Sequence, residues 1–200
     1  MKRPSLIRWI ASAITAVAAS VSLHAATIVG SGPHSSFLVI EAGDFGAPIV
    51  YEFRYTFSSI QPLDTYDMLE AIDLADPDIS FTYLNYGTPG SPNYFLEAVT
   101  YNGVTITNTP APDFEPYWVQ SVSGGKAGYI SLEPVPEGAW FEGSGISYPY
   151  RELEPGSWDG FYYGIFGDTP TIAPVPEPAT WLLLGLGGVV AVLYRGRRHA

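Results

Sequence analysis

The sequence predicts an α+β fold that is mostly β, built as one small β-rich domain with a single helix near residues 65–75. Residues 49–57 alternate between two sets of side chains, which is the period of a half-buried strand. Residues 64–77 place apolar side chains at three- and four-residue spacing, as one face of a helix requires. Asn102 and Gly103 form the strongest short hairpin signal, because both residue types tolerate the positive φ angles of a tight turn. Further segments, an N-terminal signal peptide and a C-terminal transmembrane helix, are predicted to flank this domain.

The helix has recognisable signals at both ends. Asp64 or Thr65 can cap its first turn, and Asp67 lies near its positive end, where a negative charge is stabilising. Pro77 follows the last turn and cannot continue a helix. The acidic residues of this segment are most simply its solvated side.

The strands are predicted from local patterns. A short apolar run over 37–40 can pair with the strand at 49–57, and a second strand covers 79–85 before a loop rich in Gly and Pro at 86–93. The hairpin joins 95–101 to 104–107. A two-residue turn there pairs Tyr101 with Val104, Thr100 with Thr105, and Val99 with Ile106. Additional strands are predicted over 117–122, 128–132 and 161–166. No repeat of fixed period is present, which excludes solenoids and propellers.

The first 25 residues have the three parts of a signal peptide in order. Three basic residues lie within the first eight positions, and the next thirteen are uncharged and mostly apolar, too short for an upright membrane span. Small residues follow, which predict a cut by signal peptidase after Ala25, with a cut after Ala26 as an open alternative. An uncleaved anchor helix is the competing interpretation.

The C-terminal end also has three parts. A proline-rich spacer over 171–178 ends in Val175, Pro176, Glu177 and Pro178. Residues 179–194 carry no charge and would span about 24 Å as a helix, slightly less than a hydrocarbon core of about 30 Å. The basic tail at 195–200 keeps that end in the cytoplasm and leaves the acidic body outside. The residues expected to stop membrane transfer are Arg195, Arg197 and Arg198.

This order of Pro-Glu-Pro, short apolar helix and arginine cluster resembles the PEP-CTERM sorting signal of Gram-negative bacteria. The resemblance implies that an exosortase in the inner membrane recognises Pro176, Glu177 and Pro178, cleaves nearby and passes the body onward. The precursor would be tethered in the inner membrane with residues 26–170 as its periplasmic domain. The mature protein would reach the cell surface or extracellular matrix, near the exopolysaccharide whose production the family typically accompanies. An ordinary tail anchor is the competing interpretation.

The body resembles a second family, the small β-grasp-like domains related to the transcobalamin C-terminal region. The residues that carry this resemblance are the helix over 67–72, the Asn-Gly turn, Tyr117 with Trp118, and the segment 154–163. It implies a fold over 49–166 and not cobalamin binding, which in those proteins needs a second domain.

Charge and composition exclude several function classes. Three basic and nineteen acidic residues give the body a net charge of −16, which repels nucleic acid and anionic lipid. The chain contains no cysteine, so thiol catalysis and thiolate metal sites are excluded. His34 lies in a predicted surface loop, and no Gly-x-Ser-x-Gly nucleophile motif accompanies it.

The sequence predicts no cofactor and no dedicated metal site. Asp73, Asp76 and Asp78 are weak candidates for calcium, because they lack the glycine and distal glutamate of an EF-hand loop. Two body carboxylates could serve glycoside hydrolysis, but no spacing selects a pair. Aromatic residues are abundant and form either a sugar-stacking platform or a core, and a core is expected for most of them, with Tyr148 and Tyr150 as the exposed exceptions. The candidates are Tyr117, Trp118, Trp140, Phe141, Tyr148, Tyr150, Trp158, Phe161, Tyr162 and Tyr163.

The leading hypothesis is therefore an exported surface or matrix protein that acts by adhesion or binding and is not an enzyme. Its predicted partners are signal peptidase, exosortase and an exopolysaccharide. The alternatives are a secreted carbohydrate-active enzyme and a calcium-dependent glycan-binding protein.

Overall fold

The computed structural model describes residues 26–58, 60, 62–88 and 91–174. The predicted signal peptide with Ala25 lies outside these residues. So do the motif Val175, Pro176, Glu177 and Pro178, the apolar segment 179–194, and the basic tail with Arg195, Arg197 and Arg198. In the part of the chain that is described, no helix is long and apolar enough to cross a membrane.

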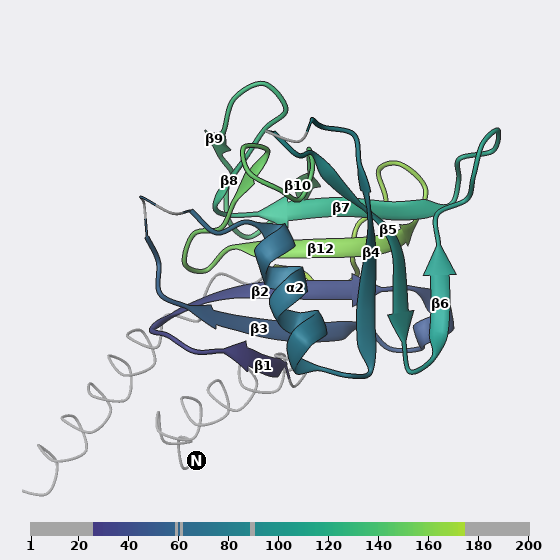
Figure 1. The fold of residues 1–200 in the computed structure, drawn as a ribbon, viewed down its shortest axis with the longest axis horizontal. Helices are drawn as coiled ribbons and strands as arrows, with labels where there is room; N and C mark the ends of the chain where they lie inside the picture. The colour runs from purple at the N-terminus through teal and green to yellow at the C-terminus, as the bar shows by residue number, and fades with distance from the viewer. Residues whose placement is uncertain (1–25, 59, 61, 89–90, 175–200) are drawn as a thin grey trace, which may run out of the picture.

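The domain has two layers (Figure 1). The rear layer is a mixed six-stranded sheet, and the front layer combines the α-helix with a three-stranded antiparallel meander whose strands cross those of the sheet behind. In spatial order the large sheet contains β1 (Thr27–Gly30), β3 (Ile49–Tyr55), β2 (His34–Glu41), β12 (Trp158–Gly164), β7 (Tyr117–Ser123) and β10 (Phe141–Glu142). The front layer contains α2 (Thr65–Ala75), β4 (Ile79–Asn85), β5 (Tyr94–Tyr101) and β6 (Val104–Thr107). A third small sheet contains β11 (Arg151–Glu152), β8 (Lys126–Ala127) and β9 (Glu133–Pro134), and a short 3-10 turn, η1, covers Gly43–Phe45.

The prediction of a mostly β domain with one α-helix is confirmed for the described residues. Helix α2 begins where predicted because the side chain of Asp64 accepts from the backbone N–H of Asp67 and the side chain of Asp67 accepts from that of Asp64. Its buried residues recur at helical spacing and face the sheet. They are Thr65, Met68, Leu69 and Ile72.

The predicted hairpin is confirmed together with its register. Tyr101 pairs with Val104, and the hydroxyls of Thr100 and Thr105 lie 2.8 Å apart across the strands. Asn102 and Gly103 both have positive φ, at 50° and 79°, as the tight turn requires. The strand over 79–85 has the predicted bounds, and the run over 37–40 pairs with β3 as part of the longer β2.

Three details of the prediction are wrong. Residues 128–132 form no strand, because a tight turn begins at Gly128 and leaves Tyr129 and Ile130 exposed. The last long strand starts at Trp158 rather than at residue 161 and ends at Gly164. His34 opens β2 instead of lying in a loop, and its ring is half-buried 6.3 Å from that of Tyr55.

The core lies between the two layers. It joins apolar side chains of β2 and β3 to the buried face of α2 and to the inner face of the meander. Its largest fully buried apolar members include Tyr51, Phe161, Leu38, Ile40 and Met68.

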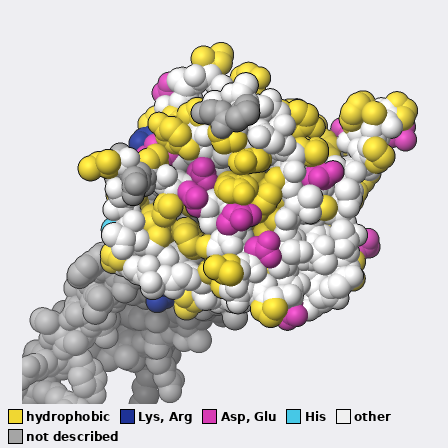
Figure 2. Space-filling model, in the orientation of Figure 1, with side chains coloured by type: hydrophobic (Ala, Val, Ile, Leu, Met, Phe, Trp, Pro, Cys, Tyr) yellow, Lys and Arg dark blue, Asp and Glu magenta, His cyan; other side chains and the backbone are white. Residues whose placement is uncertain are grey.

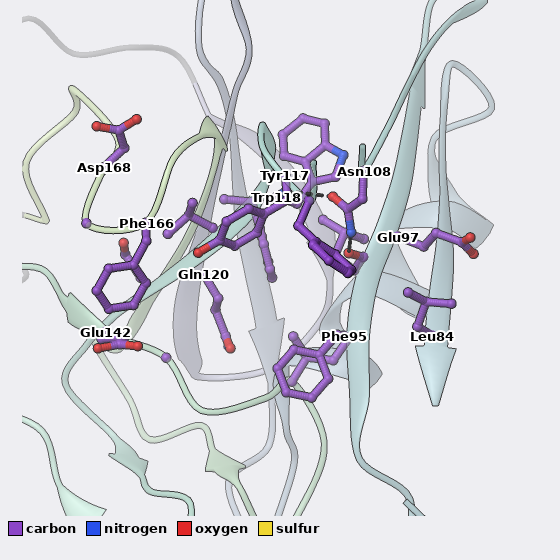
Figure 3. A pocket seen from close by; sticks show the side chains of 18 of the residues that line it. Leu84, Phe95, Glu97, Asn108, Tyr117, Trp118, Gln120, Glu142, Phe166 and Asp168 are labelled. Atoms are coloured by element: carbon purple, nitrogen blue, oxygen red, sulfur yellow. Dashed lines mark hydrogen bonds between the residues drawn. The ribbon is translucent and has the colours of Figure 1, made fainter. Parts of the chain in front are cut away.

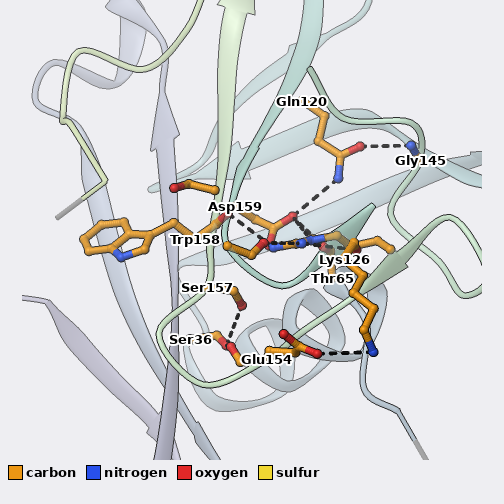
Figure 4. A network of polar contacts seen from close by, with 12 residues as sticks. Ser36, Thr65, Gln120, Lys126, Gly145, Glu154, Ser157, Trp158 and Asp159 are labelled. Carbon is orange, nitrogen blue, oxygen red and sulfur yellow. Dashed lines mark hydrogen bonds and ion pairs between the residues drawn. The ribbon is translucent and has the colours of Figure 1, made fainter. Parts of the chain in front are cut away.

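A buried ion pair ties the small third sheet to the large one (Figure 4). Arg151 and Asp159 are both completely buried, and their side chains meet through Nη2 and Oδ2 at 2.8 Å and through Nε. Asp159 also accepts from the hydroxyl of Thr65 at 2.6 Å, which locks the start of α2 onto β12. Arg151 donates its remaining N–H groups to backbone carbonyls, among them that of Gly124 at 2.8 Å. The network therefore fixes three parts of the chain at one point.

Asp64 should make stability depend on pH. Burial raises the pKa of its carboxyl to about 6; the hydrogen bond from the Asp67 N–H opposes this shift and the negative charge of Asp67 adds to it. Because the folded-state pKa lies above the ordinary value of about 3.9, the folded protein takes up the proton first as pH falls. This carboxyl should therefore add stability, on the order of 2 kcal/mol, as pH decreases from about 7 to about 4.

Urea unfolding of the wild type and of Asp64→Asn across this range measures the effect. Asparagine can still cap the helix, so the variant should unfold normally but lack this part of the pH dependence. Parallel stability profiles for the two proteins would show that Asp64 does not titrate in this way.

Candidate functional site: an acidic aromatic cleft

A cleft of about 850 Å³ lies where the meander meets one edge of β7. At this edge β10 pairs with Ser121 and Val122, so among the described residues the first part of β7 has no neighbouring strand on that side. The walls come from β5, from the connection that follows β6, from the β10 region and from the segment after β12. Figure 3 shows Phe95, Tyr117, Gln120, Glu142 and Phe166 around one space, whereas the Glu97 side chain points away from them.

Aromatic side chains dominate the lining. Four of them are well exposed, at 72% for Tyr86, 63% for Phe114, 41% for Phe141 and 63% for Phe166. Single exposed rings are common on protein surfaces, but several that gather around one cavity indicate a site for a ligand or partner. Other rings, half-buried or buried, complete the surface: Phe95, Tyr117, Trp118, Trp140 and Phe161.

Three carboxylates line the same space. Glu142 and Asp168 lie on one side together with Phe166, whereas Glu97 lies on the opposite side (Figure 3). Burial and the negative charges of Glu115 and Glu142 raise the pKa of the Tyr117 hydroxyl. The cleft therefore combines apolar rings with a negative electrostatic field.

Two amide side chains hold the cleft in shape. Asn108 donates to the carbonyl of Leu96 at 2.8 Å and accepts from the N–H of Trp118 at 2.7 Å, which joins β5 to β7. Gln120 accepts from the N–H of Gly145 at 3.1 Å and donates toward Asp159 at 3.4 Å. Gln120 therefore links the lining of the cleft to Asp159 of the buried ion pair.

The wall that contains Phe166 and Asp168 is fixed by a turn. The side chain of Asp168 accepts from the N–H of Ile165 at 2.9 Å, and this turn ends β12. Farther along, Thr171 donates to the carboxylate of Glu41 from both its backbone N–H and its hydroxyl. The predicted spacer therefore begins in contact with the domain.

One of the calcium candidates, Asp76, is engaged within the protein. Asp76 accepts from the hydroxyl of Tyr51 at 2.7 Å and from the N–H of Asp78, and so acts at the end of α2. Within the described ranges, no group of three or more His, Cys, Asp or Glu side chains is arranged to hold a metal ion. Other residues that the sequence analysis considered lie outside the cleft lining: the calcium candidate Asp73, the alternative cleavage residue Ala26, and His34.

Sequence reasoning placed only part of the aromatic surface. Tyr117, Trp118, Trp140, Phe141 and Phe161 were among the platform candidates and do line the cleft. Tyr148 is exposed as predicted, at 49%, but it lies elsewhere, and Tyr150 is only half-buried beside Tyr129. The carboxylates, the two amides and the aromatic residues at 86, 95, 114 and 166 were not selected, because no local spacing links them.

Comparison with known proteins identifies one segment. No curated protein and no solved structure matches the chain, and the resemblance of the body to transcobalamin-related domains has no support. Residues 174–198 match the family described as the PEP-CTERM protein-sorting motif. The chain is therefore an exported protein with a PEP-CTERM sorting signal, processed by an exosortase at the membrane.

Proposed function

We propose that the exported body binds an extended glycan in the aromatic cleft and acts as a non-enzymatic adhesion or binding protein of the cell surface or matrix. The single observation that carries this proposal is the gathering of four exposed aromatic rings around one cavity. Aromatic rings offer flat apolar faces against which the C–H faces of sugar rings can stack. Carboxylates and amides between them supply the few placed polar groups that a ligand site needs for orientation.

The cleft is large enough for such a ligand. Its volume of about 850 Å³ falls within the range of about 300–1,000 Å³ that is usual for ligand sites. The last lining residue of the cleft is Thr169, and the matched sorting motif begins at residue 174, so the ligand site stays with the body if the exosortase cuts beyond residue 174. The size of the cleft and its position before the sorting motif support glycan binding by the processed protein at the cell surface or in the matrix.

A secreted carbohydrate-active enzyme is the second candidate, because Glu97 and the pair Glu142 and Asp168 lie on opposite sides of the cleft. Hydrolysis needs two carboxyl groups about 5–10 Å apart across the scissile bond. Size-exclusion chromatography of the polysaccharide before and after incubation with the protein separates the two candidates. Binding alone leaves the chain length unchanged, and shortening that is lost in Glu142→Gln would establish the enzyme.

Removing two exposed rings should weaken glycan binding strongly. Each stacked ring contributes on the order of 1 kcal/mol, so Tyr86→Ala combined with Phe166→Ala should raise Kd by about tenfold or more. Calorimetric titration of the full chain with the producing cells' exopolysaccharide measures the change.

Tyr129→Ala is the matched control, because Tyr129 is equally exposed at 72% but lies outside the cleft. The control should bind like the wild type. If the double variant and the control lost the same affinity, or if neither lost any, the glycan would not bind in the cleft.

A further inference from the structure

Within the part of the chain that the structure describes, the negative charge of the cleft is not balanced by a basic side chain in the lining. Glu97, Glu142 and Asp168 contribute their carboxylates to the lining, and no lysine or arginine of the described residues lines it. The acidic residues of the visible front face are likewise scattered among apolar ones, whereas basic side chains appear only near its left edge (Figure 2).

The basic residues of the described chain are all engaged elsewhere. Arg54 pairs with Glu52 on the outer part of the sheet, at 2.8 Å. Lys126 pairs with Glu152 and Glu154 beside the small sheet, and Arg151 is buried against Asp159. None of the three can turn into the cleft without leaving its present carboxylate.

This arrangement discriminates between kinds of glycan. A neutral sugar that covers the cleft removes water from the carboxylates without replacing it by a positive charge, which is unfavourable. A glycan with uronic acids or sulfate meets like charge and is repelled. A protonated amino group gains both an attraction to the carboxylates and a cation–π contact with a neighbouring ring.

We propose that the cleft selects a glycan with free amino groups, a polymer of partly deacetylated amino sugars. This inference rests on the proposed glycan-binding function and adds its ligand class. The ammonium groups lie on the side formed by Glu142, Asp168 and Phe166, and the sugar rings extend along β7 toward Phe95. Electrostatic attraction sets the selectivity, and stacking on the aromatic rings supplies binding that is common to neutral and amino sugars.

The test uses the full chain and two glucosamine oligomers of equal length, one with free amines and one fully N-acetylated. At low salt the free-amine oligomer should bind at least tenfold more tightly, and the difference should shrink as salt is added. Combining Glu142→Gln with Asp168→Asn should remove the preference, so that the variant binds the two oligomers with equal affinity and shows little dependence of their ratio on salt. Asparagine at 168 can still accept from the N–H of Ile165, so the wall keeps its turn.

Glu133→Gln is the control for charge alone, because this exposed carboxylate lies outside the cleft, and it should keep the preference. Equal binding of the two oligomers by the wild type overturns the amino-sugar inference and leaves the glycan-binding function intact. Binding of neither oligomer, nor of any exopolysaccharide, overturns both. Tighter binding of a lysine peptide with the same number of charges assigns the cleft to a protein partner and also overturns the inference.

Discussion

Replacing Arg151 with methionine should destabilise the domain by about 3–5 kcal/mol, the usual effect of removing one partner from a buried ion pair. The carboxylate of Asp159 would remain completely buried, and its donors among the described side chains would be the Thr65 hydroxyl at 2.6 Å and the Gln120 amide at 3.4 Å. Domains of this size typically have about 5–15 kcal/mol of stability, so a large share would be lost. Chemical denaturation followed by tryptophan fluorescence measures the change.

A second variant separates the loss of charge pairing from the loss of packing. Arg151→Met combined with Asp159→Leu removes both charges, and should recover part of the lost stability because no unpaired charge stays buried. Arg54→Met is the control, since Arg54 forms a solvent-exposed pair with Glu52, and its denaturation midpoint should match the wild type. A midpoint for Arg151→Met that also matches the wild type would show that the network does not hold the fold together.

Replacing Pro176, Glu177 and Pro178 with alanine should abolish processing at the C-terminus. The exosortase acts on the sorting motif at 174–198, so the variant should accumulate as a full-length, membrane-bound precursor. Mass spectrometry of the protein from membranes and from the cell surface measures the fraction processed. Wild-type protein at the surface should lack the apolar segment over 179–194.

The chain contains its own control sequence. Val135, Pro136 and Glu137 repeat the order of the first three motif residues, but they follow β9 inside the folded domain. Replacing Pro136 and Glu137 with alanine should leave processing unchanged, because no apolar segment follows them and the backbone carbonyl that accepts from Gly124 remains. Normal processing of the motif variant, or a wild-type surface protein that keeps residues 179–194, would contradict exosortase sorting.

The parts of the fold that the sequence predicted are those with local causes. The helix at 65–75 and the turn at Asn102 and Gly103 are each specified by residues a few positions apart, and both were predicted with their bounds or register. The tail motif is likewise contiguous. Signals of this kind can be recognised without knowledge of the tertiary structure.

The errors have tertiary causes. Asp159 and Gly160 have the composition of a turn, yet they lie near the start of β12, because Arg151 neutralises the aspartate and Trp140 packs over the glycine. The segment 128–132 contains residues typical of strands, but the N–H of Gly128 donates to the carbonyl of Tyr150 at 3.0 Å and the chain then turns, which leaves Tyr129 and Ile130 exposed. In both cases a contact distant in sequence overrides the local pattern.

The cleft was beyond sequence reasoning for the same reason. Its lining draws on residues from Leu84 to Thr169, and the carboxylates that define its charge are separated by tens of positions. Abundant aromatic residues indicated either a core or a sugar platform. The structure divides them, with Phe161 in the core and Phe166 exposed at the cleft.

A crystal structure of the protein with a glucosamine oligomer tests the central claim most directly, namely that the exported body binds its ligand in the acidic aromatic cleft. We predict sugar rings stacked on Tyr117 and Phe166, with amino groups beside Glu142 and Asp168, and an uncut chain. A sugar bound on another face, or an empty cleft in crystals grown with saturating oligomer, would contradict the account.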